Sequence, residues 1–423
     1  MKLHPTPRRE GTVVVTVALS LVAILGIVAL SIDAGMLMDK RRQAASAADA
    51  AALAAADDLY YNWWANKGAD PAGTAGASAR AAAAANGYAD GAGGCTVTVN
   101  VPPQSGPFAG KAGHAEVVIA QVQPRYFSGM FGTDPVRYRA RAVSRGRRGG
   151  INDAIIVLDP SGKGALSAGG SGSVTVTGSP IQVNSNNPEA MIANGNGSMS
   201  ADQFLVGGSP GWSTPGGGSF AGPIVPSSEP IPDPLAYLPV PNPAALVVRS
   251  TNKTSLSGNR SVTLQPGVYK GGISITGGTV TLAPGIYYMD GGGFNLGGQA
   301  NLSGTGVMIY NAPQSNSDTI SLAGQGNCVL SPMMTGPYQG ILLFQDRTAR
   351  TPVSVSGSSG VTLSISGTFY AASAALSVTG NGTQQTIGSQ FISYDLVLGG
   401  NGSYSCSWDA KLTAGTREIL LVE

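Results

Sequence analysis

The chain of 423 residues carries few charges: 11% of its residues are Asp, Glu, Lys or Arg, against about 25% in an average soluble protein. Its 61 glycines and 27 prolines are too few for a low-complexity disordered chain, and 42% hydrophobic residues supply enough apolar surface to fold. A net charge of +2 and only two histidines, His4 and His114, argue against nucleic-acid binding and against a multi-histidine metal site.

The charge is divided unevenly along the chain. Residues 1–150 contain 16 Lys and Arg and 10 Asp and Glu, a net charge of +6, whereas residues 151–423 contain 9 and 13, a net charge of −4. The two parts are therefore different in kind, and the Gly-, Ser- and Thr-rich second part predicts short strands joined by tight turns.

An uncharged segment, residues 12–32, predicts a transmembrane helix. Its 21 residues form a helix of about 31 Å, which matches the hydrocarbon core of about 30 Å. A cleaved signal peptide is the alternative, but its apolar region is usually about 7–15 residues, which favours a retained anchor. Basic residues flank both ends of the span, so the positive-inside rule alone leaves the orientation open. The anchor residues are Thr12, Leu19, Leu21, Ile24, Leu25, Ile27, Leu30 and Ile32.

Beyond the span, residues 33–66 lack proline and are rich in alanine, which predicts that the helix continues outside the membrane. Small residues such as Ala44, Ala48 and Ala52 would let another helix approach closely. That helix belongs either to a partner protein or to the next segment of the same chain, and we favour the second. The aromatic residues that follow, Tyr60, Tyr61, Trp63 and Trp64, are interpreted as a docking core.

Several residues around the span carry a family resemblance. They are Arg8 and Arg9 before it, Asp33 and Gly35 after it, and then Arg41, Arg42, Gln43, Ala48, Asp49, Ala50 and Leu53. In this combination the segment resembles the N-terminal segment of TadE/TadG-like proteins of tight-adherence (Flp) pilus assembly. The resemblance implies a single-pass protein of the bacterial cytoplasmic membrane, with its N-terminus in the cytoplasm and most of the chain outside. It also implies pilus-assembly or other envelope partners, which the Ala-rich helix would contact.

Residues 67–148 are expected to form a small α+β module. Segments 95–101, 115–122 and 136–143 alternate between apolar and polar residues, which is typical of half-buried strands, and residues 125–132 suit a short helix. The basic tract Arg145, Arg147 and Arg148 is interpreted as a solvated linker at the module's end.

An internal repeat determines our expectation for residues 149–423. The sequence SVTLQPGVY at 261–269 returns 18 residues later as TVTLAPGIY at 279–287, with six of nine positions identical. A period near 20 residues with short strands and glycine corners predicts a β-solenoid, or β-helix, rather than a β-sandwich. The Pro-rich stretch 207–243 is expected to lack regular strands and to lie across the solenoid as a strap, held by Leu235, Tyr237 and Leu238.

Metal binding receives little support from the sequence. Asp159, Ser161 and Lys163 follow an apolar segment, much as the metal site of a von Willebrand A domain begins, but a lysine stands where a metal-binding hydroxyl is required. No cofactor is expected.

Catalysis receives equally little support. Asp346 and Arg347, with Arg350 nearby, are the most concentrated charged group in the second part and are interpreted as an ion pair at a coil edge. The three cysteines, Cys95, Cys328 and Cys406, allow no deduction of a disulfide, and none of them is expected to be a nucleophile.

The predicted architecture is mainly β: a Gly-rich β-solenoid preceded by a long N-terminal transmembrane helix and a small α+β module. The expected divisions are a cytoplasmic tail (1–11), the span (12–32), its helical continuation (33–66), the module (67–148) and the solenoid (149–423). We expect a non-enzymatic envelope protein with a role in pilus assembly or a surface structure. The alternatives are a surface β-helix that binds or cleaves carbohydrate and a surface adhesin, for which the short Thr-x-Thr and Ser-x-Thr runs form no regular array in the sequence.

Overall fold

The computed structural model describes residues 12–132, 134–358, 360, 362–381, 385–409 and 411–423. The chain forms two compact units. The anchor unit comprises Met1–Arg148 together with Arg417–Glu423, and the solenoid unit comprises Gly149–Thr416. The predicted fold class is confirmed: a long apolar helix and a small α+β module precede a β-solenoid of about ten coils.

Helix α1 (Thr12–Tyr61) is continuous over 50 residues and has two distinct parts. The apolar side chains from Val13 to Ile32 are almost all exposed to the surroundings, as expected for a segment covered by lipid. Beyond them, alanines at helical spacing are buried: Ala44, Ala47, Ala48, Ala51, Ala52 and Ala55. The helix ends at Tyr61, five residues before the expected end, and a separate short helix, α2 (Trp63–Asn66), follows.

The module packs helices against a four-stranded sheet. Helix α1 and helix α3 (Thr74–Ala85) contact each other through alanines, and the sheet has the order β1-β2-β3-β34. Small residues allow close approach: a Cβ atom at Gly146 would overlap the carbonyl oxygen of Ala56. The strands and the short 3-10 helix η1 are β1 (Cys95–Asn100), β2 (His114–Gln123), η1 (Ser128–Phe131), β3 (Val136–Gly150) and β34 (Gly415–Leu421).

The C-terminal end of the chain differs from expectation. Residues 417–423 belong to the anchor unit, because β34 pairs with β3 at the edge of its sheet. The basic tract is therefore not a linker: Arg145 and Arg147 lie within β3, and both guanidinium groups pair with the carboxylate of Glu418 on β34. The solenoid unit is thus inserted between two neighbouring strands of the module.

The solenoid consists of three stacks of parallel strands. The first stack is β4 (Ile155–Val157), β7 (Ile181–Val183), β10 (Phe204–Val206), β13 (Ile224–Val225), β14 (Val248–Ser250), β17 (Gly267–Lys270), β20 (Gly285–Asp290), β22 (Asn301–Ala312), β25 (Ile341–Gln345), β28 (Thr368–Ala371) and β31 (Gln390–Ser393). The second is β5 (Leu166–Gly170), β8 (Met191–Ala193), β11 (Trp212–Ser213), β15 (Thr254–Leu256), β18 (Ile273–Ile275), β21 (Phe294–Leu296), β23 (Ile320–Leu322), β26 (Val353–Gly357), β29 (Leu376–Gly380) and β32 (Leu396–Gly400). The third is β6 (Ser173–Thr177), β9 (Ser198–Ser200), β12 (Ser219–Ala221), β16 (Ser261–Leu264), β19 (Thr279–Leu282), the first part of β22, β24 (Cys328–Pro332), β27 (Leu363–Ile365), β30 (Gln385–Ile387) and β33 (Ser403–Ser407). The 18-residue repeat is visible directly, since Ser261 of β16 pairs with Thr279 of β19.

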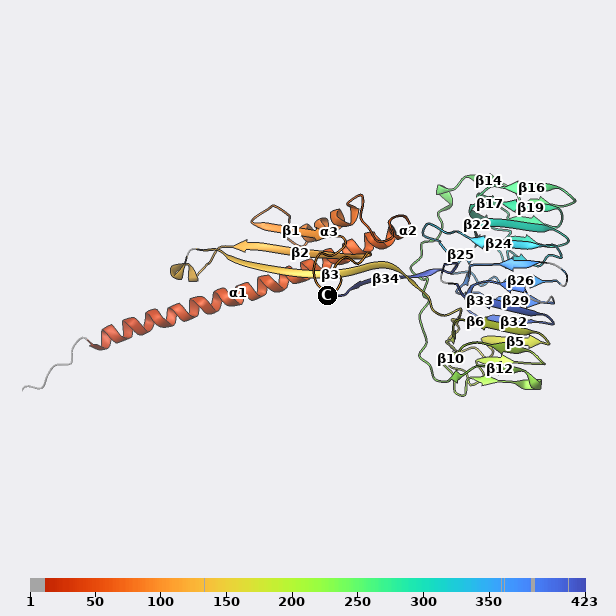
Figure 1. Cartoon of the computed structure of the whole chain (residues 1–423), viewed down its shortest axis with the longest axis horizontal. Coiled ribbons are helices and arrows are strands. Elements are labelled where there is room, and N and C mark those ends of the chain that lie inside the picture. Colours follow the sequence, from red (N-terminus) through yellow and green to blue (C-terminus); the bar gives the residue numbers. More distant parts are fainter. Residues whose placement is uncertain (1–11, 133, 359, 361, 382–384, 410) are drawn as a thin grey trace, which may run out of the picture. The chain divides into compact units, whose positions relative to one another are not determined.

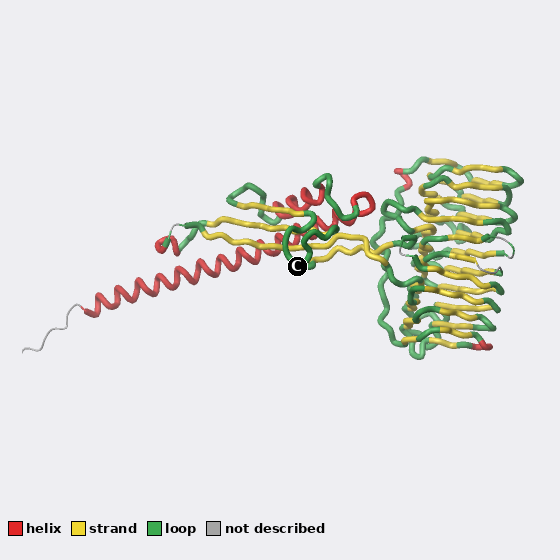
Figure 2. Tube along the Cα trace, viewed as in Figure 1, coloured by secondary structure: helices red, strands yellow, loops and turns green. Residues whose placement is uncertain are grey.

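The order of the coils in the stack differs from their order in the chain. Strand β4 of the first coil pairs with β7 of the next coil on one side and with β31, near the end of the chain, on the other. The chain therefore starts in the middle of the stack, builds to the end marked by β10 and β12, crosses to the opposite end at β14, and builds back (Figure 1). Figure 2 shows the crossing segment as an extended loop along the stack.

The crossing segment, residues 226–247, is the strap. It is shorter than the expected 207–243, because β11, β12 and β13 lie between residues 212 and 225 and complete the terminal coil. The expectation that this stretch excludes strands was wrong for a local reason: Pro210, Pro215 and Pro223 stand outside the strands, where a missing N–H breaks no ladder. Two further short helices are η2 (Pro215–Gly217) and η3 (Pro243–Ala245).

The strap covers a row of large side chains on the outer face of the first stack. Parallel register places Tyr288, Tyr310, Phe344 and Tyr370 next to one another on β20, β22, β25 and β28. Successive ring centroids lie 4.9, 5.1 and 5.0 Å apart. Leu235 and Leu238 of the strap are buried in the same cluster, which forms a second hydrophobic core outside the solenoid interior.

Truncation of the strap residue Leu235 to alanine should destabilise the solenoid unit by about 2–5 kcal/mol, because its side chain is fully buried between the strap and the aromatic row. Urea unfolding of the full-length protein in detergent, followed by the near-ultraviolet circular dichroism of the tyrosines, measures the change. Val397→Ala, at an exposed position on β32, is the control and should shift stability by no more than about 0.5 kcal/mol. Equal losses in the two variants would show that the strap contributes no stability.

Candidate functional site

The charged group at Asp346 and Arg347 holds the strap. The Arg347 guanidinium donates to the carbonyl oxygens of Leu235 at 2.8 Å and Leu238 at 2.7 Å, and to the Tyr370 hydroxyl at 2.7 Å. Tyr370 in turn donates to a carboxylate oxygen of Asp233 in the strap at 2.5 Å. Because the Arg347 guanidinium is hydrogen-bonded to strap carbonyl oxygens, Arg347 has a structural role.

The Asp346 carboxylate is also occupied by hydrogen bonds within the protein. Its carboxylate accepts hydrogen bonds from the Tyr310 hydroxyl at 2.5 Å and from the backbone and side chain of Thr348. The predicted ion pair is not formed, since within the described ranges no salt bridge joins Asp346 to Arg347 or Arg350.

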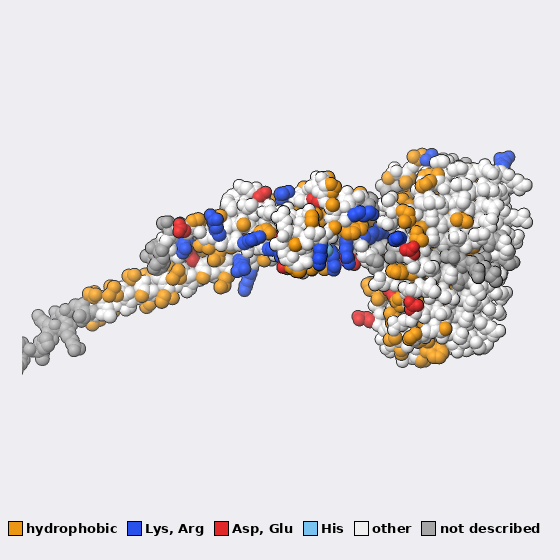
Figure 3. All heavy atoms as spheres, in the orientation of Figure 1, with side chains coloured by type: hydrophobic (Ala, Val, Ile, Leu, Met, Phe, Trp, Pro, Cys, Tyr) orange, Lys and Arg blue, Asp and Glu red, His pale blue; other side chains and the backbone are white. Residues whose placement is uncertain are grey.

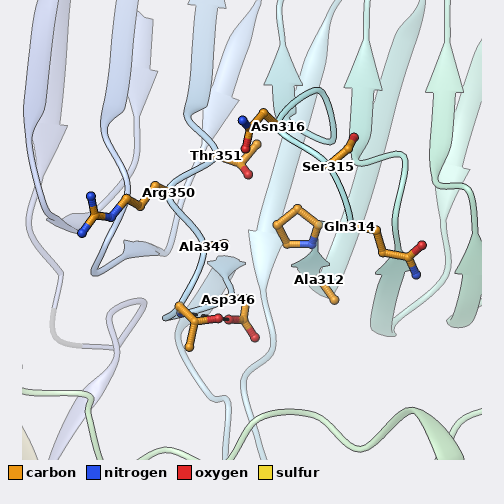
Figure 4. A pocket seen from close by; sticks show the side chains of 10 residues that line it. Ala312, Gln314, Ser315, Asn316, Asp346, Ala349, Arg350 and Thr351 are labelled. Atoms are coloured by element: carbon orange, nitrogen blue, oxygen red, sulfur yellow. Dashed lines mark hydrogen bonds between the residues drawn. The ribbon is translucent and has the colours of Figure 1, made fainter.

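A polar cavity of about 510 Å³ lies beside this group, between the loop after β22 and the loop after β25. Figure 4 shows Ser315, Asn316 and Thr351 around it, whereas the Arg350 guanidinium points away from the other labelled side chains. The lining supplies hydroxyl and amide groups suited to a small polar molecule. It contains one carboxylate, Asp346, whereas glycoside hydrolysis needs a pair.

Two carboxyl groups meet elsewhere on the solenoid, at the junction between its last and first coils. Asp159 follows β4 and Asp395 follows β31; their carboxyl groups interact electrostatically, and the backbone N–H of Asp159 donates to the carbonyl oxygen of Tyr394 at 3.0 Å. Burial, together with the negative charge of Asp159, raises the pKa of Asp395 to about 6. Protonation of Asp395 at acidic pH therefore stabilises the junction, because it removes a negative charge beside Asp159.

The Asp159 loop does not resemble a metal site in its contacts. One carboxylate oxygen accepts the backbone N–H groups of Ser161 and Gly162, both at 2.9 Å, and Lys163 pairs with Glu189 at 2.5 Å. Among the described residues no group of three His, Cys, Asp or Glu side chains converges. The loop therefore uses its aspartate to close a turn.

The three cysteines are free and buried. Burial raises the pKa of the Cys328 and Cys406 thiols to about 12 and also raises that of Cys95. Because the thiolate is the reactive form, burial disfavours reaction of these side chains near neutral pH.

The two other outer faces of the solenoid carry rows of small hydroxyl side chains. On the second stack the register aligns Ser255, Ser274, Asn295, Ser321, Ser354, Ser377 and, beyond Val397, Ser167. On the third stack it aligns Thr263, Thr281 and Ser303, then Val329 and Ser364, and further along Ser405, Thr175 and Ser200. Neighbouring strands lie about 4.8 Å apart, so these regular rows form from residues some 20 positions apart in the sequence. In Figure 3 most of the visible solenoid surface is neither charged nor hydrophobic.

The family-motif residues take different places on α1. Arg8 and Arg9 lie outside the described residues. Arg41 and Arg42 are exposed, Gln43 donates to the Asp39 carboxylate at 2.9 Å, and Ala48 is buried. Gly35 is exposed, and Asp49, Ala50 and Leu53 are half-buried.

Asp33 makes the most extensive contacts of the motif residues. Its carboxylate accepts hydrogen bonds from the backbone N–H groups of Phe127 and Ser128 and from the Ser128 hydroxyl, at 3.1, 2.7 and 2.5 Å. The Ser128 hydroxyl and the backbone donors lower the pKa of Asp33. No feature of the sequence near Asp33 predicts this contact, which spans more than 90 residues.

The expectation that envelope partners bind through the Ala-rich helix is corrected in one respect. Ala44, Ala48 and Ala52 are fully buried against α3 and the sheet of their own module, so they are inaccessible to a partner. The preferred interpretation, packing against the same chain, is the one observed. Of the aromatic residues, Tyr60 is buried and Tyr61 is exposed; Arg417 of β34 lies over both rings and pairs with Asp57.

Replacing Asp395 with asparagine should stabilise the protein at pH 7–8 by on the order of 1–2 kcal/mol, a value reduced for solvent screening. The raised pKa means that wild-type stability falls as the pH rises from about 4 to about 6, when Asp395 ionises beside Asp159. Urea unfolding at a series of pH values measures this loss, which should be smaller in the variant. Asp202→Asn, at an exposed position, is the control; an identical pH profile for Asp395→Asn and wild type would contradict the raised pKa of Asp395.

Comparison with known proteins gives one finding. Residues 11–58 match the model of the family described as putative Flp pilus-assembly TadE/G-like. No curated protein and no solved structure matches the chain. The match covers the exposed apolar part of α1, Asp33 and most of the buried alanines, and it confirms the resemblance seen in the sequence. Residues 11–58 are therefore similar to the TadE/G-like family of Flp pilus assembly.

Proposed function

We propose that this protein is a non-enzymatic component of the bacterial envelope, anchored in the cytoplasmic membrane, that presents a β-solenoid outside the cell membrane in support of Flp pilus assembly. The TadE/G-like match over residues 11–58 is the observation that carries the proposal. It coincides with the one helix in the described part of the chain that is long and apolar enough to cross a membrane.

The continuity of α1 supports an anchoring role. The same helix provides the exposed apolar span and, without a break, the buried alanine stripe of the module. A continuous helix transmits position and rotation far better than a flexible linker would. We therefore propose that the span and the module act as one rigid piece, which suits a protein that holds a place within an assembly.

The contacts of the acidic residues support a non-enzymatic role. Asp346 binds Tyr310 and Thr348, Asp233 binds Tyr370, and Asp318 accepts the backbone N–H groups of Gln314 and Ser315. The negative charge of Asp159 helps to raise the pKa of Asp395, and the cavity beside Asp346 is lined by no second carboxylate. The carboxylates of Asp346, Asp233 and Asp318 are therefore occupied by hydrogen bonds that hold the strap and the loops.

Aspartate in the middle of the span should prevent membrane anchoring. The double variant Leu21→Asp, Ile24→Asp is expected to move from the membrane pellet to the soluble fraction after alkaline carbonate extraction, because each central aspartate costs about 2.5–3.5 kcal/mol on insertion. The matched control is Leu21→Val, Ile24→Val, which should stay in the pellet. Retention of the aspartate variant in the pellet would overturn the membrane anchor.

The orientation and the pilus role need separate experiments. A membrane-impermeant maleimide should label Ser46→Cys, exposed on α1, in intact spheroplasts, and Thr6→Cys only after permeabilisation; the native cysteines are buried.

Deletion of the gene should remove Flp-type pili, and the wild-type protein should restore them while the aspartate variant should not. Normal piliation after deletion would contradict the proposed role.

A second candidate function, adhesion to a neutral hydroxyl-rich surface such as a polysaccharide, is favoured by the hydroxyl rows. Thr263 and Thr281 are exposed on adjacent coils of one row. Thr263→Lys with Thr281→Lys should abolish co-sedimentation of the detergent-solubilised protein with insoluble cellulose, if this surface binds it. Val240→Lys with Ala244→Lys adds the same charge at exposed strap positions and should leave co-sedimentation unchanged. Absence of wild-type co-sedimentation would dismiss this candidate for that polymer.

A further inference from the structure

The tip of the hairpin between β2 and β3 exposes two aromatic side chains. Tyr126 and Phe127 are 55% and 56% exposed, in a unit whose other large apolar side chains are mostly buried outside the membrane span. Isolated exposed aromatic residues are ordinary, but these two are adjacent and sit at a tip that the structure holds firmly in place. Their position relative to α1 indicates what covers them.

Asp33 fixes the tip to α1 at the end of the apolar span. Its carboxylate accepts both backbone N–H groups at Phe127 and Ser128, and the Ser128 side chain is buried against it. On the same side, Tyr126 and Leu30 line one small cavity of about 170 Å³ between the hairpin and the helix. The tip therefore reaches back over the last turn of the span.

The length of the span sets the depth of the tip. Residues 12–32 form a helix of about 31 Å, which equals the hydrocarbon thickness of about 30 Å. If the span crosses the bilayer, Ile32 and Asp33 lie at the boundary between acyl chains and headgroups. The hydrogen bonds to Asp33 place Phe127 at that same level.

We propose that Tyr126 and Phe127 insert into the headgroup interface of the bilayer that α1 crosses, so that the anchor unit contacts lipid at two places. The inference rests on the proposed membrane anchor. Tyrosine is enriched at this depth because its ring is apolar and its hydroxyl is hydrated. Exposed basic residues nearby, Arg125 and Arg137 on the hairpin and Arg41 on α1, suit lipid phosphates.

The second contact constrains the orientation of the anchor unit. A lone transmembrane helix can rotate about its axis and tilt, whereas interfacial side chains at a second point resist both movements. The tip is part of the β2–β3 hairpin, and Asp33 joins that hairpin to α1. An interfacial contact at the tip therefore restrains the helix and the module together. The face that the module presents along the membrane is then fixed.

Depth-dependent quenching tests the proposal in the full-length protein, reconstituted into vesicles of phosphatidylcholine and phosphatidylglycerol. An environment-sensitive nitrobenzoxadiazole label on Phe127→Cys should be quenched at least about twofold more by a headgroup spin-labelled lipid than the same label on Tyr61→Cys. Tyr61 is 44% exposed but lies 28 residues beyond Asp33 on the same helix, about 42 Å away. Equal quenching at the two positions would overturn the proposal and would leave a protein partner as the occupant of the tip.

A third label separates this inference from the membrane anchor. Ile24→Cys lies in the middle of the span, and its label should be quenched by a lipid that carries the spin label deep in the acyl chain. Quenching at position 24 without quenching at 127 contradicts only the tip contact, whereas no quenching at 24 contradicts the anchor itself. The unsubstituted protein measures background labelling of the buried cysteines.

Removal of the Asp33 carboxylate tests how the tip is held. Asp33→Ala in the Phe127→Cys background should reduce quenching at 127 toward the level seen at 61, because three donors lose their acceptor, while quenching at 24 should stay unchanged. Ser128→Ala removes one of these donors and should have a smaller effect. Undiminished quenching in Asp33→Ala would show that Asp33 does not set the depth of the tip.

Discussion

Burial of the aromatic row beneath the strap is the interaction on which the arrangement of the solenoid depends. The chain begins its coils in the middle of the stack and must therefore travel from one end to the other. The strap that makes this passage has few backbone ladder bonds of its own, so its carbonyl groups need other donors. Arg347, Tyr338 and Asn184 supply them, while Leu235 and Leu238 fill the spaces above the rings. Apolar burial and directed hydrogen bonds act together at the same few residues.

Because the strap carries the chain from one end of the stack to the other, the first and last coils of the solenoid become neighbours. Because β31 returns to stack on β4, the chain enters and leaves the solenoid at neighbouring coils. Buried polar contacts join the two points: Gln390 donates to the carbonyl oxygen of Asp153, and the backbone N–H of Ala414 donates to the Thr368 hydroxyl. The solenoid is thus connected to the module by two strands, β3 and β34, which are held together by Arg145, Arg147 and Glu418.

The sequence predicted local features well and long-range ones poorly. The copy at 261–269 and 279–287 predicted the solenoid because adjacent coils are also adjacent in the chain. The pairing of β4 with β31 joins residues more than 230 positions apart, and no repeat marks it. The same limit applies to β34, to the contact of Asp33 with Ser128 and to the junction of Asp159 with Asp395. Each of these contacts joins residues that are far apart in the sequence, and local periodicity carries no information about which distant segments meet.

The low charge of the chain follows from the parallel register. In a solenoid each outward-facing residue lies about 4.8 Å from the equivalent residue of the next coil. A charged residue that recurs with the repeat would therefore lie beside a residue of the same charge. Like charges directly opposite each other destabilise a sheet, whereas hydroxyl groups can bond along the row, as Thr281 and Ser303 do at 3.3 Å. Repetition of a coil therefore selects Ser, Thr and Asn for exposed positions. The anchor unit has no such repetition, and three of its arginines, Arg141, Arg145 and Arg147, pair with Glu116, Glu418 and Glu423.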